Sequence, residues 1–172
     1  MRIFLAMVLC AAALAAADEP RRAPGFALPD RQMKVHDLYD YRGKPVIVEF
    51  MQTSCPHCGA FADVLEKVYQ KFGDKVQILT VANPPDNFNT VAQFIQTRNI
   101  KYPILFDMGQ VAYSYLLKQQ FSLPQVFLID AKGMIVNHWE YSPMMLDIFE
   151  GNGLVREVEK LLPVPMTPAK KK

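Results

Sequence analysis

Residues 46–58 read VIVEFMQTSCPHC, and this stretch decides how the chain folds. The run Val46–Met51 is apolar at odd and even positions apart from Glu49, as expected of a central strand that is covered on both faces. Cys55 and Cys58 follow where a helical pattern begins. Two cysteines at such a junction indicate a reversible dithiol/disulfide centre, because the positive helix N-terminus favours the thiolate of the first cysteine.

The two residues between the cysteines support this interpretation. Proline is favoured in the first helical turn, where Pro56 would fix the backbone. His57 adds a titratable cation, and we expect it to give a charge-assisted hydrogen bond to the Cys55 thiolate. Such a bond would stabilise the reduced centre and favour oxidation of partners. We therefore predict that Pro56 and His57 tune the redox centre.

Two other roles of the cysteine pair were weighed. A zinc site needs two more ligands, and the sequence offers only His36, His57 and His138 and one distant cysteine. A purely structural disulfide is weaker still, because closing so short a loop constrains the unfolded chain little. No metal or other cofactor is predicted.

Glu49 is the candidate acid and base. Within a strand covered on both faces its carboxyl is expected to be buried, which tends to raise the pKa and suits the group to giving and taking a proton. The alternative is a side chain near the strand end that reaches water.

The first 17 residues have the pattern of a secretory signal peptide. Arg2 precedes the apolar run 3–16, and a small-x-small sequence ends before Asp18. The run is shorter than the ~20 residues of a membrane span, so an uncleaved anchor is the lesser alternative. A lipoprotein signal at Cys10 is disfavoured by Leu9.

Removal of residues 1–17 leaves 155 residues, which fits one domain. Cys55 and Cys58 are then the only cysteines of the sequence. An exported chain with one close pair is not a disulfide-stapled scaffold. The formal charge of +2 falls to +1, which indicates neither nucleic acid nor a membrane surface as a partner. We predict a linker at 18–23, a domain at 24–162 and a disordered tail at 163–172.

Periodicity and turn residues predict alternating strands and helices, hence an α/β fold with a mixed sheet. The expected strands are 26–28, 33–38, 46–51, 76–82, 102–106, 126–129 and 134–139, and the expected helices are 59–72, 91–98, 111–118 and 153–162. Residues 141–152, with Met144 and Met145, form a long link that is either a lid or packing. We favour packing, because methionine commonly fills cores.

The order of several short motifs resembles the TlpA/ResA-type thioredoxin-like family of exported thiol-disulfide oxidoreductases over about residues 24–140. The motifs are Pro24-x-Phe26-x-Leu28-x-Asp30, Asp37-Leu38, Arg42-Gly43-Lys44-Pro45, the apolar strand, Cys55-x-x-Cys58 and Leu123-Pro124-x-x-Phe127-Leu128-Ile129-Asp130-x-x-Gly133.

This resemblance implies a thioredoxin-like fold with a mixed central sheet flanked by helices and an N-terminal strand extension. It implies that Cys55 is the attacking nucleophile and Cys58 the resolving thiol. It implies that Glu49 corresponds to the buried acidic residue that precedes the first cysteine in this family. Leu123 and Pro124 would bind substrate, with a cis-proline at Pro124 facing the cysteine pair.

The resemblance also implies location in the bacterial periplasm and a role in cell redox homeostasis. The implied substrates are protein dithiols or disulfides, for instance in apocytochrome c during its maturation or in copper-site cysteines, with a membrane protein as electron donor or acceptor. The Pro-His dipeptide is that of oxidising DsbA-type centres, whereas TlpA/ResA-type proteins are mostly reductants, so the direction stays open. Ser54 stands where the family usually has an aromatic residue.

Two other functions remain open. A peroxiredoxin-like peroxidase would share the fold, but such families place threonine or serine where this chain has Gln52. A Sco-type copper assembly protein would use both cysteines and a distal histidine such as His138, since thiolates bind Cu(I), although its cysteines are usually spaced more widely.

Overall fold

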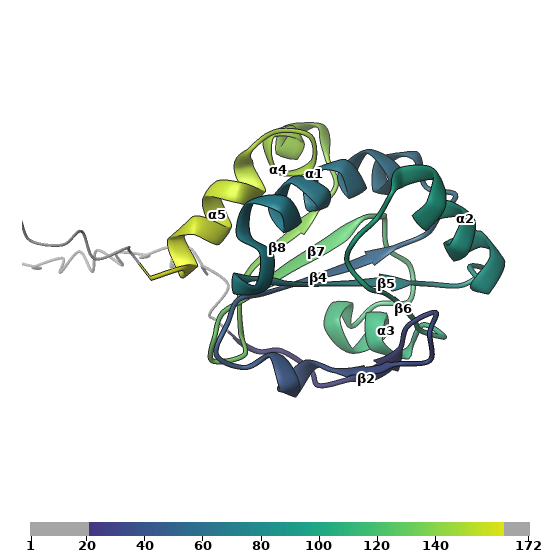
Figure 1. Cartoon of the computed structure of the whole chain (residues 1–172), viewed down its shortest axis with the longest axis horizontal. Coiled ribbons are helices and arrows are strands. Elements are labelled where there is room, and N and C mark those ends of the chain that lie inside the picture. Colours follow the sequence, from purple (N-terminus) through teal and green to yellow (C-terminus); the bar gives the residue numbers. More distant parts are fainter. Residues whose placement is uncertain (1–20, 164–172) are drawn as a thin grey trace, which may run out of the picture.

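A computed structural model describes residues 21–163, which form a six-stranded sheet covered by helices on one face and by a helix and a small hairpin on the other (Figure 1). The predicted signal peptide, residues 18–20 of the linker and the tail from residue 164 lie outside the described residues. The strand order is β1-β8-β7-β4-β5-β6. These strands are β1 Arg21–Arg22, β4 Val46–Met51, β5 Gln77–Ala82, β6 Ile104–Phe106, β7 Gln125–Ile129 and β8 Met134–Glu140.

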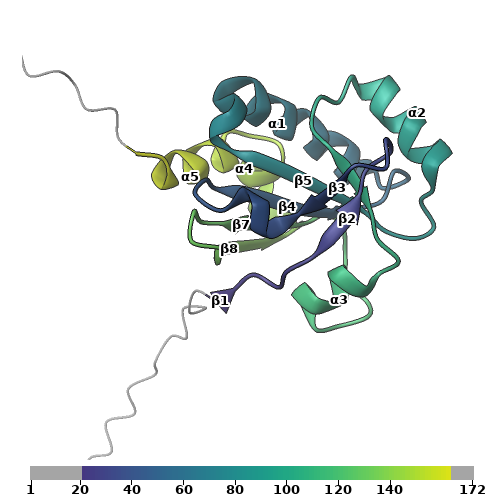
Figure 2. The same ribbon diagram turned by 60° about the horizontal axis from the view of Figure 1, so that its bottom comes forward.

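The sheet is mixed, as predicted. β4, β5 and β6 run parallel, whereas β7 is antiparallel to β4 and to β8. A second sheet pairs β2 (Ala27–Pro29) with β3 (Val35–Asp37); Figure 2 shows it in front of the main sheet, and β2 contacts β6. The helices are α1 Pro56–Phe72, α2 Phe88–Arg98, α3 Gln110–Leu116, α4 Leu146–Phe149 and α5 Gly153–Leu161, with 3-10 turns at Leu38–Tyr41, Gly73–Lys75 and Pro143–Met145.

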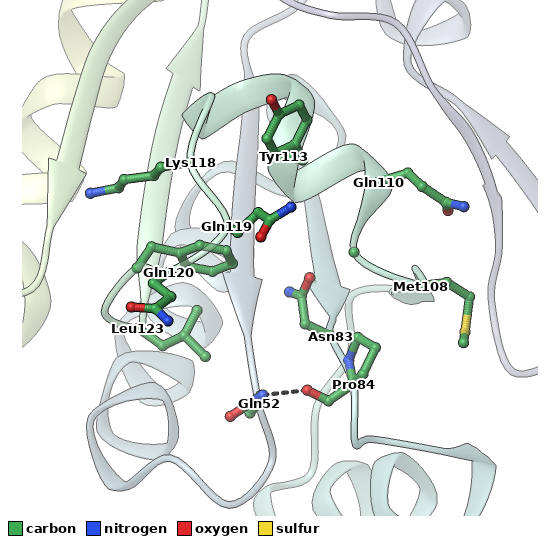
Figure 3. A pocket seen from close by; sticks show the side chains of 12 residues that line it. Gln52, Asn83, Pro84, Met108, Gln110, Tyr113, Lys118, Gln119, Gln120 and Leu123 are labelled. Carbon is green, nitrogen blue, oxygen red and sulfur yellow. Dashed lines mark hydrogen bonds between the residues drawn. The ribbon is translucent and has the colours of Figure 1, made fainter.

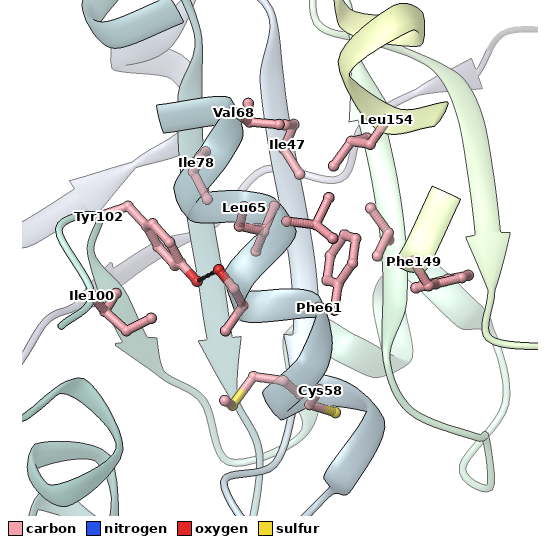
Figure 4. Close-up of a cluster of buried hydrophobic side chains, with 14 of the residues drawn as sticks. Ile47, Cys58, Phe61, Leu65, Val68, Ile78, Ile100, Tyr102, Phe149 and Leu154 are labelled. Carbon is pink, nitrogen blue, oxygen red and sulfur yellow. Dashed lines mark hydrogen bonds between the residues drawn. The ribbon is translucent and has the colours of Figure 1, made fainter. Parts of the chain in front are cut away.

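Strand β4 lies between two hydrophobic clusters. All six of its residues are buried, and successive side chains point to opposite faces. Ile47 and Met51 pack with α1, α4 and α5, whereas Val48 and Phe50 pack with α3 and the N-terminal segment. Figure 4 shows the first cluster, in which apolar residues of α1 lie against the sheet. The prediction of a central strand covered on both faces is confirmed.

Helix α1 begins three residues earlier than predicted, at Pro56. Cys55 is its N-cap, and the Cys58 N–H donates to Cys55 Sγ, which satisfies one of the free amides at the helix start. The helix ends at Gly73, as predicted, with a φ of 51° that favours glycine. The early start places both cysteines in the first turn of the helix.

Two parts of the sequence interpretation need correction. Arg21–Arg22 form strand β1, which pairs with β8, so residues 21–23 of the predicted linker belong to the domain. In residues 141–152 the packing comes from Ile148 and Phe149, which are buried, whereas Met144 is 90% exposed. Packing was the correct expectation for this segment, but the methionines do not provide it. Among residues 21–163, no helix is both long and apolar enough to cross a membrane.

Candidate functional site

Cys55 lies at the end of the β4–α1 connection and is partly exposed. Its Sγ accepts the Cys58 N–H at 3.2 Å, and its S–H donates to the Leu123 carbonyl at 3.7 Å. Both cysteines are free thiols in this structure. A sulfur that caps a helix N-terminus faces the positive end of the helix dipole.

Cys58 differs from Cys55 because it is fully buried in the cluster under α1. Burial raises the pKa of the Cys58 thiol, and the negative charge of Glu49 raises it further. Cys58 is therefore held as a thiol that needs a base before it can attack. The resemblance implied that Cys55 attacks and Cys58 resolves, and in the structure Cys55 is partly exposed and Cys58 is buried.

Glu49 lies in the middle of β4 and is 1% exposed, so the predicted burial is confirmed. Its Oε2 accepts a hydrogen bond from Thr80 Oγ1 at 2.8 Å, and its buried Oε1 has no hydrogen-bond partner within the described part of the chain. Burial raises the pKa of Glu49 to about 8, while the Thr80 hydrogen bond acts in the opposite direction. A carboxyl with this pKa can both accept and return a proton near neutral pH.

Leu123 and Pro124 lie beside the cysteine pair, as the resemblance implied. The Leu123–Pro124 peptide bond is cis. The Pro124 carbonyl accepts the Tyr141 N–H, which connects this turn to the end of β8. The turn therefore places the Leu123 carbonyl next to Cys55.

His57 is placed differently from the sequence expectation. Its exposed ring stacks on Tyr141, with ring centroids 3.8 Å apart and planes 20° from parallel. The hydrogen bonds of Cys55 Sγ in residues 21–163 go to the Cys58 N–H and the Leu123 carbonyl, not to His57. The expected direct bond was wrong, because the imidazole packs against an aromatic residue that sequence distance gave no reason to place there.

A groove of about 650 Å³ begins at Leu123 and runs between α3 and the β5–α2 loop (Figure 3). Side-chain amides line much of it, namely Gln52, Asn83, Gln110, Gln119 and Gln120. Met108 and Tyr113 add exposed apolar surface. Lys118, at its rim, pairs with Glu140 at 3.4 Å. The groove thus offers neutral hydrogen-bonding groups, and it adjoins Cys55 through Leu123, whose carbonyl accepts the Cys55 S–H.

The ligands required for copper assembly are not brought together. His138 stacks on Phe127, with centroids 4.1 Å apart, and Phe127 belongs to the cluster on the face opposite α1. Cys55 and Cys58 belong to the α1 face. Within residues 21–163, no group of three or more His, Cys, Asp and Glu side chains is arranged to hold a metal ion.

The position that would carry a peroxidase hydroxyl holds Gln52, whose side-chain amide donates to the Pro84 carbonyl. The neighbouring Thr53 directs its hydroxyl to Asp86. Both side chains tie the β4–α1 connection to the loop after β5. They act as supports of this connection. Neither side chain forms a hydrogen bond with Cys55 in the described structure, although the Cys55 N–H donates to the Gln52 carbonyl at 3.1 Å.

Three features of the site are not predicted from the sequence. They are the Thr80 hydroxyl on Glu49, the Tyr141 ring on His57 and the amide-lined groove. Strand register could have suggested Thr80, because it lies opposite Glu49 in the parallel β4–β5 pair. Nothing in the local sequence pattern singles out Tyr141.

The fold and the cysteine pair define a thioredoxin-like protein with a dithiol at the start of its first long helix. Comparison with known proteins agrees. The AhpC/TSA family profile matches residues 20–138, so the chain belongs to the AhpC/TSA family. The predicted resemblance to TlpA/ResA-type proteins is confirmed by the relatives described next.

The thiol-disulfide oxidoreductase ResA of Geobacillus thermodenitrificans is 34% identical over 117 residues, which cover 66% of this chain. The match spans 64% of that relative, just under two thirds of its length. The thioredoxin-like protein YneN of Bacillus subtilis is 28% identical over 119 residues, with 68% of each chain covered.

Solved structures confirm the fold. A thioredoxin-family thiol:disulfide interchange protein from Chlorobium tepidum superposes with a TM-score of 0.70 at 22% identity and covers 86% of this chain and 100% of its own. A secreted Mycobacterium tuberculosis disulfide oxidoreductase homologous to DsbE of E. coli gives a TM-score of 0.67 at 20% identity, with 79% and 96% covered. The predicted thioredoxin-like α/β fold is therefore correct.

Proposed function

We propose that this chain is an exported thiol-disulfide oxidoreductase that exchanges disulfides with partner proteins through Cys55 and Cys58. The observation that carries the proposal is the unequal placement of the two thiols. Cys55 caps α1 at the surface, whereas Cys58 is buried on the same face of the sheet as Glu49. The relatives named thiol-disulfide oxidoreductase support the same chemistry.

The exchange proceeds in two balanced steps. The Cys55 thiolate attacks one sulfur of a partner disulfide, the partner's S–S bond breaks, and its second sulfur leaves as a thiolate that takes up a proton. Glu49 then accepts the Cys58 proton, and the Cys58 thiolate attacks Cys55 Sγ. The mixed disulfide breaks, the partner leaves with both thiols reduced, and Cys55 and Cys58 become the disulfide.

The same steps in reverse oxidise a partner dithiol. The partner then gives two electrons to the Cys55–Cys58 disulfide, and Glu49 returns its proton to Cys58. A membrane protein that exchanges electrons with Cys55 would complete the cycle in either direction. Export to the bacterial periplasm follows from the signal peptide predicted for residues 1–17.

The groove beside Leu123 supports a polypeptide as the partner. Its amides, such as Gln52 and Gln120, can pair with the N–H and C=O groups of an extended chain, and Met108 offers apolar contact. We propose that the residues flanking the partner's cysteine lie in this groove. Apocytochrome c thiols and copper-site cysteines are candidate partners of this kind.

The test is an equilibrium titration of the purified protein with reduced and oxidised glutathione. We expect one reversible two-electron transition that forms the Cys55–Cys58 disulfide, and no such transition in Cys55→Ser or Cys58→Ser. The measured potential also gives the direction, because a value near that of DsbA indicates an oxidant and a value near that of thioredoxin a reductant.

Two parallel assays address the alternatives. Fast consumption of peroxide, with oxidation of Cys55 and turnover by a thiol donor, would favour the peroxidase. Stoichiometric Cu(I) binding that is lost in His138→Ala would favour copper assembly. We expect neither result. Gln52 has no hydroxyl and its amide donates to the Pro84 carbonyl, and the His138 ring stacks on Phe127, on the face of the sheet opposite α1.

A further inference from the structure

Tyr141 connects two parts of the proposed redox centre. Its ring stacks on His57, with centroids 3.8 Å apart, and its backbone N–H donates to the Pro124 carbonyl at 3.3 Å. It is the first residue after β8 and begins the link to α5. One residue thus contacts both the dipeptide between the cysteines and the turn that faces them.

Tyr141 is itself supported from behind by aromatic contacts. The Phe149 ring meets it nearly edge-on, with centroids 5.4 Å apart, and Phe149 in turn contacts Phe61 of α1 at 5.2 Å. Phe149 is 1% exposed, and Figure 4 shows it beside Phe61 in the cluster under α1. A continuous row of rings therefore joins His57 to the hydrophobic core.

The link that carries Phe149 is tightly folded. A Cβ on Gly153 would lie 2.7 Å from the Asp147 carbonyl oxygen, so this close approach requires glycine. Asp147 also pairs with Arg156 of α5. These contacts hold α4 against α1 and α5, so the segment serves as a support for Tyr141 and not as a lid.

We infer that Tyr141 is a positioning residue of the redox centre, which fixes the His57 ring against the face of the phenol in the first turn of α1. A cation over an aromatic face is attracted by the ring quadrupole. A positive charge on a ring held in this turn would attract the thiolate of the reduced centre, whereas the disulfide carries no charge to attract. Tyr141 would thereby favour the reduced state. The inference rests on the proposed function, because it concerns the Cys55–Cys58 couple.

The first test is the glutathione equilibrium of five proteins: the wild type, Tyr141→Leu, Tyr141→Phe, His57→Ala and the double variant of Tyr141→Leu with His57→Ala. We expect Tyr141→Leu to shift the equilibrium about threefold to fivefold toward the disulfide, equivalent to about 15 to 20 mV. Tyr141→Phe keeps the ring and should stay within about twofold of the wild type. With His57→Ala in place, Tyr141→Leu should add less than about twofold.

Two outcomes of this cycle contradict the inference. One is a shift of the glutathione equilibrium by Tyr141→Leu that is equally large in the wild type and in His57→Ala. The other is a shift by Tyr141→Phe as large as that by Tyr141→Leu. Thermal unfolding confirms that each variant is folded, and if Tyr141→Leu is not, the decision rests on Tyr141→Phe and on the spectroscopic test.

The second test is the NMR chemical shift of the His57 imidazole protons, which a stacked ring moves upfield. We expect this shift in the wild type and in Tyr141→Phe and its loss in Tyr141→Leu. An unshifted His57 resonance in the folded wild type overturns the inference. The measurement needs no disulfide exchange, so a protein that shows the stacking but forms no Cys55–Cys58 disulfide would contradict the proposed function and leave the stacking established.

Discussion

The two faces of strand β4 are equally buried but differ in chemistry. On one face Phe50 packs edge-on against Tyr115 and Phe127, with ring centroids 5.3 and 6.0 Å apart. On the other face Glu49 lies between Ile47 and Met51, on the side of the sheet that α1 covers. Alternate residues of one strand thus pack aromatic rings on one side and hold a buried carboxyl on the other.

The two faces differ in how burial affects the stability of the protein. An aromatic cluster gains stability from burial, whereas a buried carboxyl is held by one hydroxyl and is forced toward its neutral form. Glu49 lies near enough to Cys58 for its negative charge to raise the pKa of the Cys58 thiol. We therefore expect changes at Glu49 to alter chemistry, and changes at Phe50 to alter stability.

Glu49→Gln should slow the resolving step by about 10²-fold to 10⁴-fold, because it removes the base that takes the Cys58 proton. The first attack by Cys55 should change little. Rapid-quench analysis of mixed-disulfide decay separates the two steps. Phe50→Leu is the matched control on the opposite face, and it should lower stability while the resolving rate is kept. A slowing by Glu49→Gln of less than about twofold near neutral pH would leave Glu49 without a catalytic role.

The stability of the reduced protein should depend on pH through Glu49. The folded protein keeps the proton up to about pH 8, while the unfolded chain releases it near the ordinary pKa of 4.5. Stability therefore falls as the pH rises from about 4.5 to about 8, by about 3 to 5 kcal/mol. Urea unfolding of the wild type and Glu49→Gln across this range should give a difference that grows with pH. Parallel curves would show that Glu49 is not the titrating group.

A smaller effect on the rate is expected for a substitution in the groove. Met108→Glu places a charge in the proposed path of the partner chain and should lower the rate with a cysteine-containing peptide disulfide about tenfold. The rate with a small disulfide should be unchanged, because the cysteines are untouched. Met33→Glu is a suitable control, since Met33 is 67% exposed and Met108 79% exposed. Equal losses in both variants, or a loss with the small disulfide, would argue against the groove.

Local patterns were sufficient for much of the fold. The apolar run Val46–Met51, the stop at Gly73 and the hairpin of β7 and β8 each depend on residues close in sequence, so the strands and helices other than β1 and α4 are predicted within a few residues. The burial of Glu49 followed from its neighbours in the same strand. The resemblance to the TlpA/ResA-type family also placed Leu123 and Pro124 beside the cysteine pair.

Contacts between distant segments could not be predicted in this way. Thr80 reaches Glu49 through the register of two parallel strands, and Tyr141 reaches His57 only after β8 has returned beside β7. The exposure of Met144 depends on how the turn before α4 is folded, which hydrophobicity does not determine. These tertiary contacts set the details of the site on the α1 face.

The most direct test of the central claim is trapping of partners by single-cysteine variants. Cys58→Ser should accumulate mixed disulfides through Cys55, because the resolving thiol is absent, whereas Cys55→Ser should accumulate almost none, since Cys58 is buried. Mass spectrometry of the trapped species, before and after reduction, identifies the cysteine that is bound. Trapping through Cys55 alone is the predicted result, and equal trapping through both cysteines would contradict the assigned roles.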